Sequence, residues 1–104
     1  MGKVPHLEEV AAFKKRLSKK IIIHKLIFFG SFARGDYRKW SDIDLLVVSN
    51  DFKSVNKAKR PVSLYDHWPY LLPVDFLCYT PEEFERAKKK ATIVREAVRE
   101  GIEI

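Results

Sequence analysis

Residues 21–48 read IIIHKLIFFGSFARGDYRKWSDIDLLVV, and this stretch decides the fold. Its first part, Ile21 to Phe29, is rich in β-branched and aromatic residues and ends at Gly30, which predicts a strand followed by a turn. The segment from Ser31 to Gly35 is too short for more than one helical turn. Its last part, Ser41 to Val48, alternates in polarity and predicts a second strand.

The alternation of polar and apolar residues in the second strand predicts the environment of each of its two faces. One face carries Ile43, Leu45 and Val47, and the other carries Asp42, Asp44, Leu46 and Val48. A strand with a polar start and a continuous apolar end is typical of one that is buried on both faces. Its N-terminal end is therefore expected to open onto a site.

Helical patterns flank these strands. Apolar residues at helical spacing predict a first helix over Pro5–Lys19. A second helical segment starts after Thr80, which is followed by a proline and, three residues on, by a glutamate, as in a capped helix start. An apolar stripe continues toward a C-terminal cap at Gly101, with a break near Lys88–Lys90. The stripe consists of Phe84, Ala87, Ala91, Val94 and Val98.

The remaining segments complete the predicted fold. They are a short helix near Val55–Lys59 followed by irregular chain, a third strand over Val74–Tyr79 and an edge strand over Ile102–Ile104. The long connection before the third strand is sufficient for a crossover, so the second and third strands can run parallel. We therefore predict an α+β fold with a mixed β-sheet flanked by helices, formed by one domain over residues 1–104.

Composition restricts the environment and the partners. The 104 residues include 20 Lys and Arg against 14 Asp and Glu, a formal charge of +6, which favours anionic partners. A single cysteine, Cys78, excludes an internal disulfide and fits a reducing compartment. No apolar run approaches the roughly 18–20 residues that span a bilayer, and lysines interrupt any early apolar run. We expect a soluble cytoplasmic protein with no membrane partner.

Two features of the deciding stretch can carry chemistry. Gly30-Ser31 lies where a strand ends and a helical turn begins, a junction at which backbone N–H groups can cradle a phosphate. The alternative is a plain turn with a serine cap. Asp42 and Asp44 are two apart on a strand, so their carboxylates lie on one side, roughly 6.5–7 Å apart.

Asp75 adds a third acid, at the start of another apolar strand. Acids at strand starts are often simply tolerated there. If the first two strands are antiparallel and the second and third parallel, the turn and all three acids meet at one edge of the sheet. Such an arrangement suggests a cation, and two carboxylates at this distance suit Mg²⁺.

The spacing Gly30-Ser31, ten residues, then Asp42-Ile43-Asp44 and an apolar strand resembles the signature of the polymerase-β-type nucleotidyltransferases. The sequences GSFARG at 30–35 and SDIDLLV at 41–47 resemble those of the small prokaryotic branch, the minimal nucleotidyltransferases. The likeness is close over residues 21–48, and Val74-Asp75-Phe76-Leu77 matches the strand of the third acid.

The resemblance implies roles for particular residues. Gly30, Ser31 and Arg34 would bind the phosphates of a nucleoside triphosphate. Asp42, Asp44 and Asp75 would be the catalytic residues and would bind two Mg²⁺ ions. The last of these would also orient or deprotonate the attacking hydroxyl. The reaction would be transfer of AMP from ATP, or of another nucleoside monophosphate, to a hydroxyl group.

In the minimal branch, the resemblance implies an antitoxin whose partner is a HEPN-type toxin, modified on a side-chain hydroxyl. Two alternatives stay open: a non-catalytic module that neutralises its partner by contact, and an enzyme acting on a small molecule. A site this open should be covered by a partner or by a second copy of the chain.

Other side chains are interpreted as structural. Cys78 alternates with Asp75 and should point into the core, and His24 and His67 have no partner at ligand spacing. The aromatic residues Trp40, Trp68, Tyr65 and Tyr70 are taken as core or interface filler. The Lys88–Lys90 run is taken as a solvated helix face, and nucleic acid is not expected as a partner because no aromatic residues interleave the basic ones.

Overall fold

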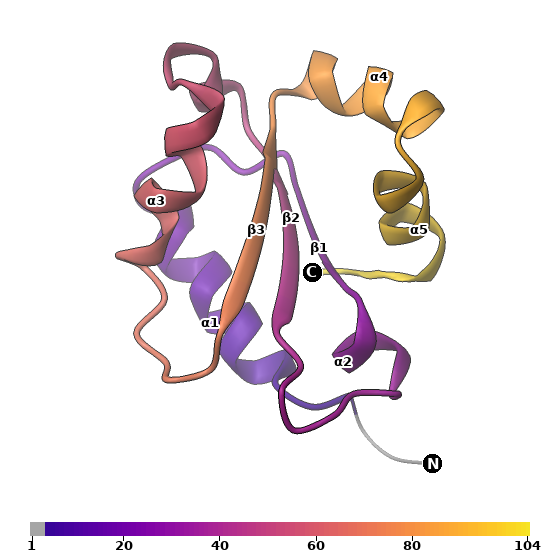
Figure 1. Cartoon of the computed structure of the whole chain (residues 1–104). Helices are drawn as coiled ribbons and strands as arrows, with labels where there is room; N and C mark the ends of the chain where they lie inside the picture. Colours follow the sequence, from indigo (N-terminus) through magenta and orange to yellow (C-terminus); the bar gives the residue numbers. More distant parts are fainter. Residues whose placement is uncertain (1–3) are drawn as a thin grey trace.

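A four-stranded sheet of order β3-β2-β1-β4 stands between two layers of helices in the computed structural model, which describes residues 4–104 (Figure 1). The strands are β1 (Lys25–Phe29), β2 (Ile43–Val48), β3 (Val74–Tyr79) and β4 (Ile102–Glu103). β1 is antiparallel to both β2 and β4, and β2 is parallel to β3. The predicted α+β class and mixed sheet are thus confirmed, while the first three residues of the predicted domain lie outside the described residues.

The helices divide between the two faces of the sheet, with α1 and α3 on one side and α4 and α5 on the other (Figure 1). They are α1 (Leu7–Ser18), α2 (Ser31–Arg34), α3 (Arg60–Tyr65), α4 (Pro81–Lys90) and α5 (Thr92–Glu100), with 3-10 turns at η1 (Asn50–Ser54) and η2 (Lys57–Lys59). Within residues 4–104, we find no helical segment with the length and apolarity to cross a membrane.

Both faces of β2 are buried, as its alternation predicts. Its odd-numbered residues Ile43, Leu45 and Val47 join the core beneath α1 and α3, and Leu46 and Val48 join the core beneath α4 and α5. All five are at most 2% exposed. Transfer of this apolar surface out of water is the main stabilising contribution to the sheet.

The start of α4 follows the prediction from its capping signal. The Thr80 hydroxyl accepts a hydrogen bond from the Glu83 N–H, and the Glu83 carboxylate accepts one from the Thr80 N–H at 2.8 Å. The helical segment breaks at Ala91, directly after the predicted Lys88–Lys90 break. In α5, however, Ala97 is buried and Val98 is 47% exposed, so the stripe position predicted at Val98 is wrong.

The first strand is shorter than predicted. Residues 21–24 are not part of β1, and Ile22 is 66% exposed. The Ile21 N–H still donates to the carbonyl of Leu17 in α1, and β2 ends opposite Lys25. The His24 N–H also donates to the Val48 carbonyl at 2.8 Å. Residues 21–23 lie beyond the end of β2, and their β-branched composition does not decide their structure.

The segment between β2 and β3 also differs from the expectation. The predicted helix near Val55–Lys59 is only the 3-10 turn η2, and the regular helix is α3, which was expected to be irregular. Pro61 does not break this helix because it occupies the first turn, where a missing N–H has no cost.

The aromatic residues and the cysteine have distinct environments. Trp68 is 7% exposed and packs edge-to-face on Phe13, with ring centroids 5.5 Å apart. Trp40 is 76% exposed and Tyr65 is 45% exposed, so neither is core filler. Cys78 packs against the core beneath α1 and α3, and burial raises the pKa of its thiol to about 12.

Candidate active site

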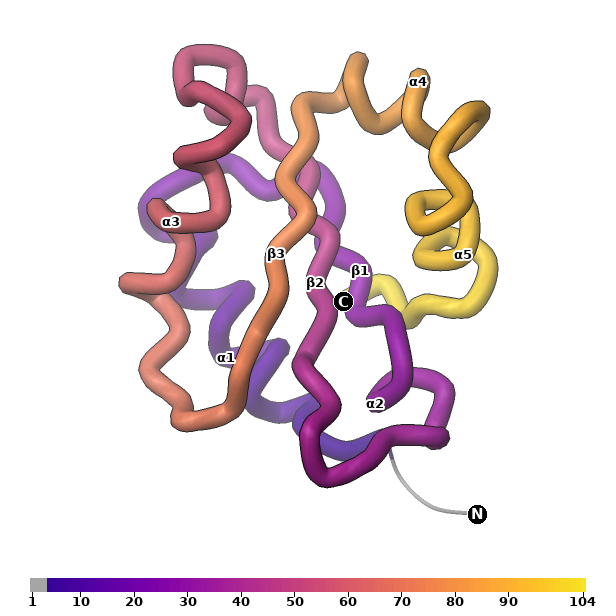
Figure 2. Tube along the Cα trace, in the orientation of Figure 1, coloured from indigo at the N-terminus to yellow at the C-terminus, as the bar shows by residue number. Residues whose placement is uncertain are grey.

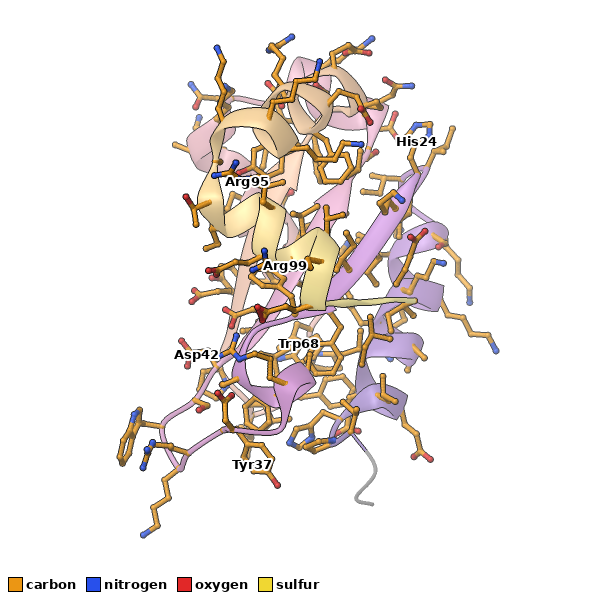
Figure 3. The ribbon with its side chains drawn as sticks, turned by 90° about the vertical axis from the view of Figure 1, so that its right-hand side faces the viewer. His24, Tyr37, Asp42, Trp68, Arg95 and Arg99 are labelled. Atoms are coloured by element: carbon orange, nitrogen blue, oxygen red, sulfur yellow. The ribbon has the colours of Figure 1, made fainter. Side chains whose placement is uncertain are left out.

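Two of the predicted acids lie side by side at one end of the sheet. Because β2 and β3 are parallel and in matching register, Asp44 lies directly opposite Asp75. Both side chains are on the sheet face that α4 and α5 cover, since each precedes by two a residue packed in that core, Leu46 or Leu77. Asp42 immediately precedes β2, and Figure 3 shows it below Arg95 and Arg99 of α5.

The turn after β1 meets these acids from the other strand. Phe29 pairs with Asp44, so the chain leaves β1 at Gly30 beside this residue of β2. Figure 2 shows the trace turning from β1 into α2 next to β2. Gly30 has φ of +83°, and a Cβ at this position would overlap the Asp44 carboxylate. The glycine therefore provides both an unusual backbone conformation and the space that the acid occupies.

Ser31 does not act as a helix cap. The N-cap of α2 is Gly30, and Ser31 is the first residue of the helix. Its carbonyl accepts hydrogen bonds from the N–H groups of Gly35 and Asp36, which close the turn. The alternative interpretation of Ser31 as a capping residue is therefore not realised.

The environment of Asp44 is unfavourable for a negative charge. Burial raises the pKa of its carboxyl to about 6, the charges of Asp75 and Asp42 contribute further to the increase, and Arg34 opposes it. Like-charged carboxylates at short range disfavour each other's ionisation. Retaining an acid under these conditions is typical of a functional site.

A cavity of about 270 Å³ opens between this end of the sheet and α5. Phe29, Gly30, Ser31, Arg34 and Asp44 line one side, and Ile93, Glu96 and Glu100 of α5 line the other. Arg34 reaches from its side toward α5, with its Nη1 3.9 Å from the Glu100 carboxylate, and its Nε is 3.3 Å from Asp36. Four of the six predicted site residues thus border one cavity, whereas Asp42 and Asp75 are not among its lining residues.

The contribution of α5 is the part of the site that sequence reasoning missed. Ile93, Glu96 and Glu100 recur at intervals of three and four, so one helix face carries them all. That periodicity is visible in the sequence. The periodicity does not predict that this helix face lies against the Gly30-Ser31 turn. That contact depends on the break at Ala91, where the chain turns back and places α5 over the sheet.

The chemistry of these donors fits Mg²⁺. Carboxylate oxygens are its preferred protein ligands, and Mg²⁺ commonly binds to one or two carboxylates together with substrate phosphates. Within the described range 4–104, no three Asp, Glu, His or Cys side chains form a complete metal-ligand group. The neighbouring pair Asp44 and Asp75 therefore fits an ion that a phosphate-bearing substrate helps to bind.

A family model described as a nucleotidyltransferase domain matches residues 10–102, and the chain belongs to this family. The sequence-based identification of a minimal nucleotidyltransferase, and of an enzyme of this class, is thereby confirmed.

Individual relatives agree with this assignment. A Methanocaldococcus jannaschii protein named "Putative protein adenylyltransferase" is 28% identical over 100 residues, covering 94% of this chain and 97% of the relative. A second protein of the same name and organism is 49% identical over 49 residues, covering 46% of this chain and 47% of the relative. The crystal structure of a "putative nucleotidyltransferase" from Sulfolobus solfataricus has the same fold, with a TM-score of 0.59, 23% identity, and coverage of 99% of this chain and 87% of that one.

Proposed function

We propose that this nucleotidyltransferase transfers AMP from ATP to a hydroxyl group of a protein, and that residues 1–104 form a single nucleotidyltransferase domain. The observation that carries the proposal is the juxtaposition of Asp44 and Asp75 beside the Gly30-Ser31 turn. The adenylyl group and the protein acceptor are supported by the names of the two Methanocaldococcus jannaschii relatives.

The phosphates of ATP would lie in the cavity against Gly30, Ser31 and Arg34. Gly30 has no side chain to obstruct their approach, and the Ser31 hydroxyl can donate a hydrogen bond to a phosphate oxygen. The Arg34 guanidinium would exchange its long contact with Glu100 for a charge-assisted hydrogen bond to a phosphate.

Asp42, Asp44 and Asp75 would together hold two Mg²⁺ ions with the triphosphate. When bound, the ions would neutralise charge on the phosphates and make the α-phosphorus more electrophilic. Their binding would also offset the repulsion between the acids, which, together with the larger effect of burial, raises the pKa of Asp44.

The transfer step requires a base near the acceptor. Asp75 is exposed and directly opposite Asp44, so it can reach a hydroxyl that approaches from outside the sheet. The hydroxyl oxygen forms a bond to the α-phosphorus as the bond from that phosphorus to the bridging oxygen breaks. Pyrophosphate leaves with the electron pair of the broken bond, and the carboxylate of Asp75 accepts the hydroxyl proton.

The acceptor we propose is a side-chain hydroxyl of a HEPN-type toxin, which the modification would silence, so that this chain acts as an antitoxin in the cytoplasm. Asp75 is exposed and does not line the cavity, so this side of the site is open. The partner would therefore complete the site, and a second copy of the chain is the alternative cover.

The test incubates the purified chain with ATP labelled in the adenine or α-phosphate, Mg²⁺ and a purified HEPN-type protein. The expected result is label on the partner, with a mass increase of one AMP on a hydroxyl-bearing residue. Asp44→Asn and Asp75→Asn should abolish the transfer, whereas Asp66→Asn, an exposed acid at the end of α3, should retain it.

The same experiment distinguishes the alternatives. Neutralisation of the partner without any label, under conditions in which ATP binds, would favour a non-catalytic binding module. Label that appears only on an added small hydroxyl compound would favour a small-molecule nucleotidyltransferase. Either outcome would contradict the proposed protein acceptor.

A further inference from the structure

Three basic segments that are far apart in the sequence meet at the end of the sheet opposite the candidate active site. They are residues 19–25, 51–60 and 82–90, and together we call them the basic end. The first two are joined by a hydrogen bond of 2.9 Å from the Ile22 N–H to the Asp51 carboxylate. The last two are joined by Lys53–Glu82 and Lys57–Glu83 ion pairs at 3.6 and 3.7 Å.

The basic end accounts for the whole net charge of the chain. It contains eleven Lys and Arg against four Asp and Glu, whereas the rest of the chain has nine against ten. In Figure 3, side chains that end in blue nitrogen atoms project from the end of the molecule at which α4 and His24 lie. The formal charge of +6 is thus concentrated at one end instead of being spread over the surface.

Each of the four acids of the basic end has a hydrogen-bond or ion-pair partner within the chain. Asp51 accepts the Ile22 N–H, Glu82 pairs with Lys53, and Glu85 lies 2.9 Å from Lys88. Glu83 forms a 2.6 Å hydrogen-bonded ion pair with the buried Arg60. Among the described residues, six basic side chains of this end have no acidic group within ion-pair distance: Lys19, Lys20, Lys59, Arg86, Lys89 and Lys90.

The positive charge surrounds a hollow. Lys57, Arg86 and Lys90 line a surface cavity of about 240 Å³ together with Tyr79, Glu83 and Ala87. Arg60 largely compensates the negative charge of Glu83, because the two form the shortest ion pair described in the chain. Three cations therefore face a volume large enough for a phosphate group and part of its neighbours.

The character of the basic end favours a nucleic acid over a protein. Protein interfaces have an apolar centre, whereas nucleic-acid interfaces are more polar and much more positive. Ile22 is the one large apolar side chain of the basic end that is exposed among the described residues. The others lie elsewhere: Tyr37, Trp40, Val62, Tyr65, Leu71, Ile93 and Val98.

We propose that the basic end binds the sugar–phosphate backbone of a nucleic acid without regard to its sequence, with Lys57, Arg86 and Lys90 contacting phosphates. The sequence did not predict this, because no single basic run has interleaved aromatic residues. Only the fold brings three runs together and places the ring of Tyr79 in the hollow between them. Four strand residues, on the order of 13 Å, separate Val48 at this end from Asp44 at the other, so both sites can be occupied together.

The test measures binding of a fluorescent 20-nucleotide RNA, and of DNA of the same sequence, by anisotropy from 50 to 200 mM salt. We expect micromolar affinity for both at low salt and a linear fall of log K with log salt. The triple variant Lys57→Ala, Arg86→Ala, Lys90→Ala should bind about tenfold more weakly or worse, with a slope reduced by about 2, because each lost contact contributes about 0.7 for a single strand.

A matched control removes the same charge elsewhere. Lys15→Ala, Lys39→Ala, Arg95→Ala changes three exposed basic residues outside the basic end and should alter the affinity by less than about threefold. Equal losses in the two triple variants would overturn the proposal. Binding of polyglutamate as tight as that of RNA at the same ionic strength would also overturn it and would indicate an acidic protein partner.

A measurement on the unmodified chain covers the case in which a variant does not fold. With ATP and Mg²⁺ saturating the candidate active site, addition of the RNA should shift amide NMR signals within residues 53–60 and 79–90. Shifts confined to residues 30–44, or loss of RNA binding upon ATP addition, would place the nucleic acid in the active site and contradict a separate basic end.

Discussion

Asp44 and Asp75 occupy directly opposed positions on the parallel strands β2 and β3, with their carboxylates on the same face of the sheet. Neighbouring strands are about 4.8 Å apart, so two negative charges are brought together where one of them is half-buried. Burial and this proximity raise the pKa of Asp44 to about 6. The folded state therefore contains an arrangement that is unfavourable until a cation is bound.

Asp44→Asn should stabilise the metal-free protein at neutral pH. The pKa of Asp44 rises from 3.8 to about 6 on folding, so its ionisation opposes folding: the cost is absent below about pH 4 and complete above about pH 6. Solvent screening at this half-exposed group reduces the expected increase in unfolding free energy to about 1 kcal/mol. Denaturant unfolding in EDTA should show this gain at pH 7.5 and its disappearance near pH 4.

The control for this measurement is Asp66→Asn, which should change stability by less than about 0.5 kcal/mol at either pH. Addition of Mg²⁺ with ATP should raise the melting temperature of the unmodified protein much more than that of Asp44→Asn. A variant that is less stable by the same amount at both pH values, and that keeps the full ligand effect, would show that Asp44 has a structural role.

Gly30→Ala should disrupt both the fold and the site. The substitution would place a Cβ on the Asp44 carboxylate at a backbone φ of +83°. We expect a loss of about 2–3 kcal/mol in unfolding free energy and a loss of triphosphate binding. Gly35→Ala is the matched control: its φ is +94°, but nothing lies within 4 Å of the added Cβ, so only backbone strain of about 1 kcal/mol applies. Equal effects of the two substitutions would refute the close approach of Gly30 to Asp44.

Ser31→Ala should weaken triphosphate binding by about 1–2 kcal/mol, the contribution of a hydrogen bond to a charged group. Its effect on stability should be small, because the N-cap of α2 is Gly30 and not Ser31. Isothermal calorimetry of ATP binding and thermal unfolding separate the two effects. Ser54→Ala, at an exposed serine in η1, should change neither. An effect of Ser31→Ala on stability alone would identify Ser31 as a structural residue.

Glu83→Gln should destabilise the protein at neutral pH but not in strong acid. Burial opposes the Glu83 charge, but hydrogen bonds from Arg60 and the Thr80 N–H outweigh it and lower the pKa from 4.5 to about 2. A depressed acid pKa stabilises the folded state above about pH 4.5, and this contribution is lost as the pH falls toward 2. Solvent screening at this partly exposed group reduces the expected loss of unfolding free energy at pH 7 to about 1–2 kcal/mol.

Urea unfolding at pH 7 and at pH 2.5 provides the comparison for this variant. Glu82→Gln is the control, since its pair with Lys53 is exposed on both sides and should contribute less than about 0.5 kcal/mol. If Glu83→Gln were as stable as the unmodified protein at pH 7, the Arg60–Glu83 pair would not join α3 to α4.

Local sequence signals were sufficient to predict the elements in which those signals agree with burial in the folded protein. The alternation in β2 and the apolar run of Val74–Tyr79 identified two strands, and the Thr80 capping box identified the start of α4. The spacing from Gly30-Ser31 to Asp42-Ile43-Asp44 was sufficient to identify the family, because a tight turn and an alternating strand impose it locally.

The tertiary structure decided what depends on partners. Residues 21–23 have strand composition but lie beyond the end of β2, and Pro61 lies in the first turn of a helix where a break was expected. The α5 wall of the cavity and the meeting of three basic segments likewise follow from chain reversals at Ala91 and along the crossover before β3. Local propensity and periodicity act over a few residues, whereas pairing, burial and the summed field of charges depend on which distant segments the fold brings together.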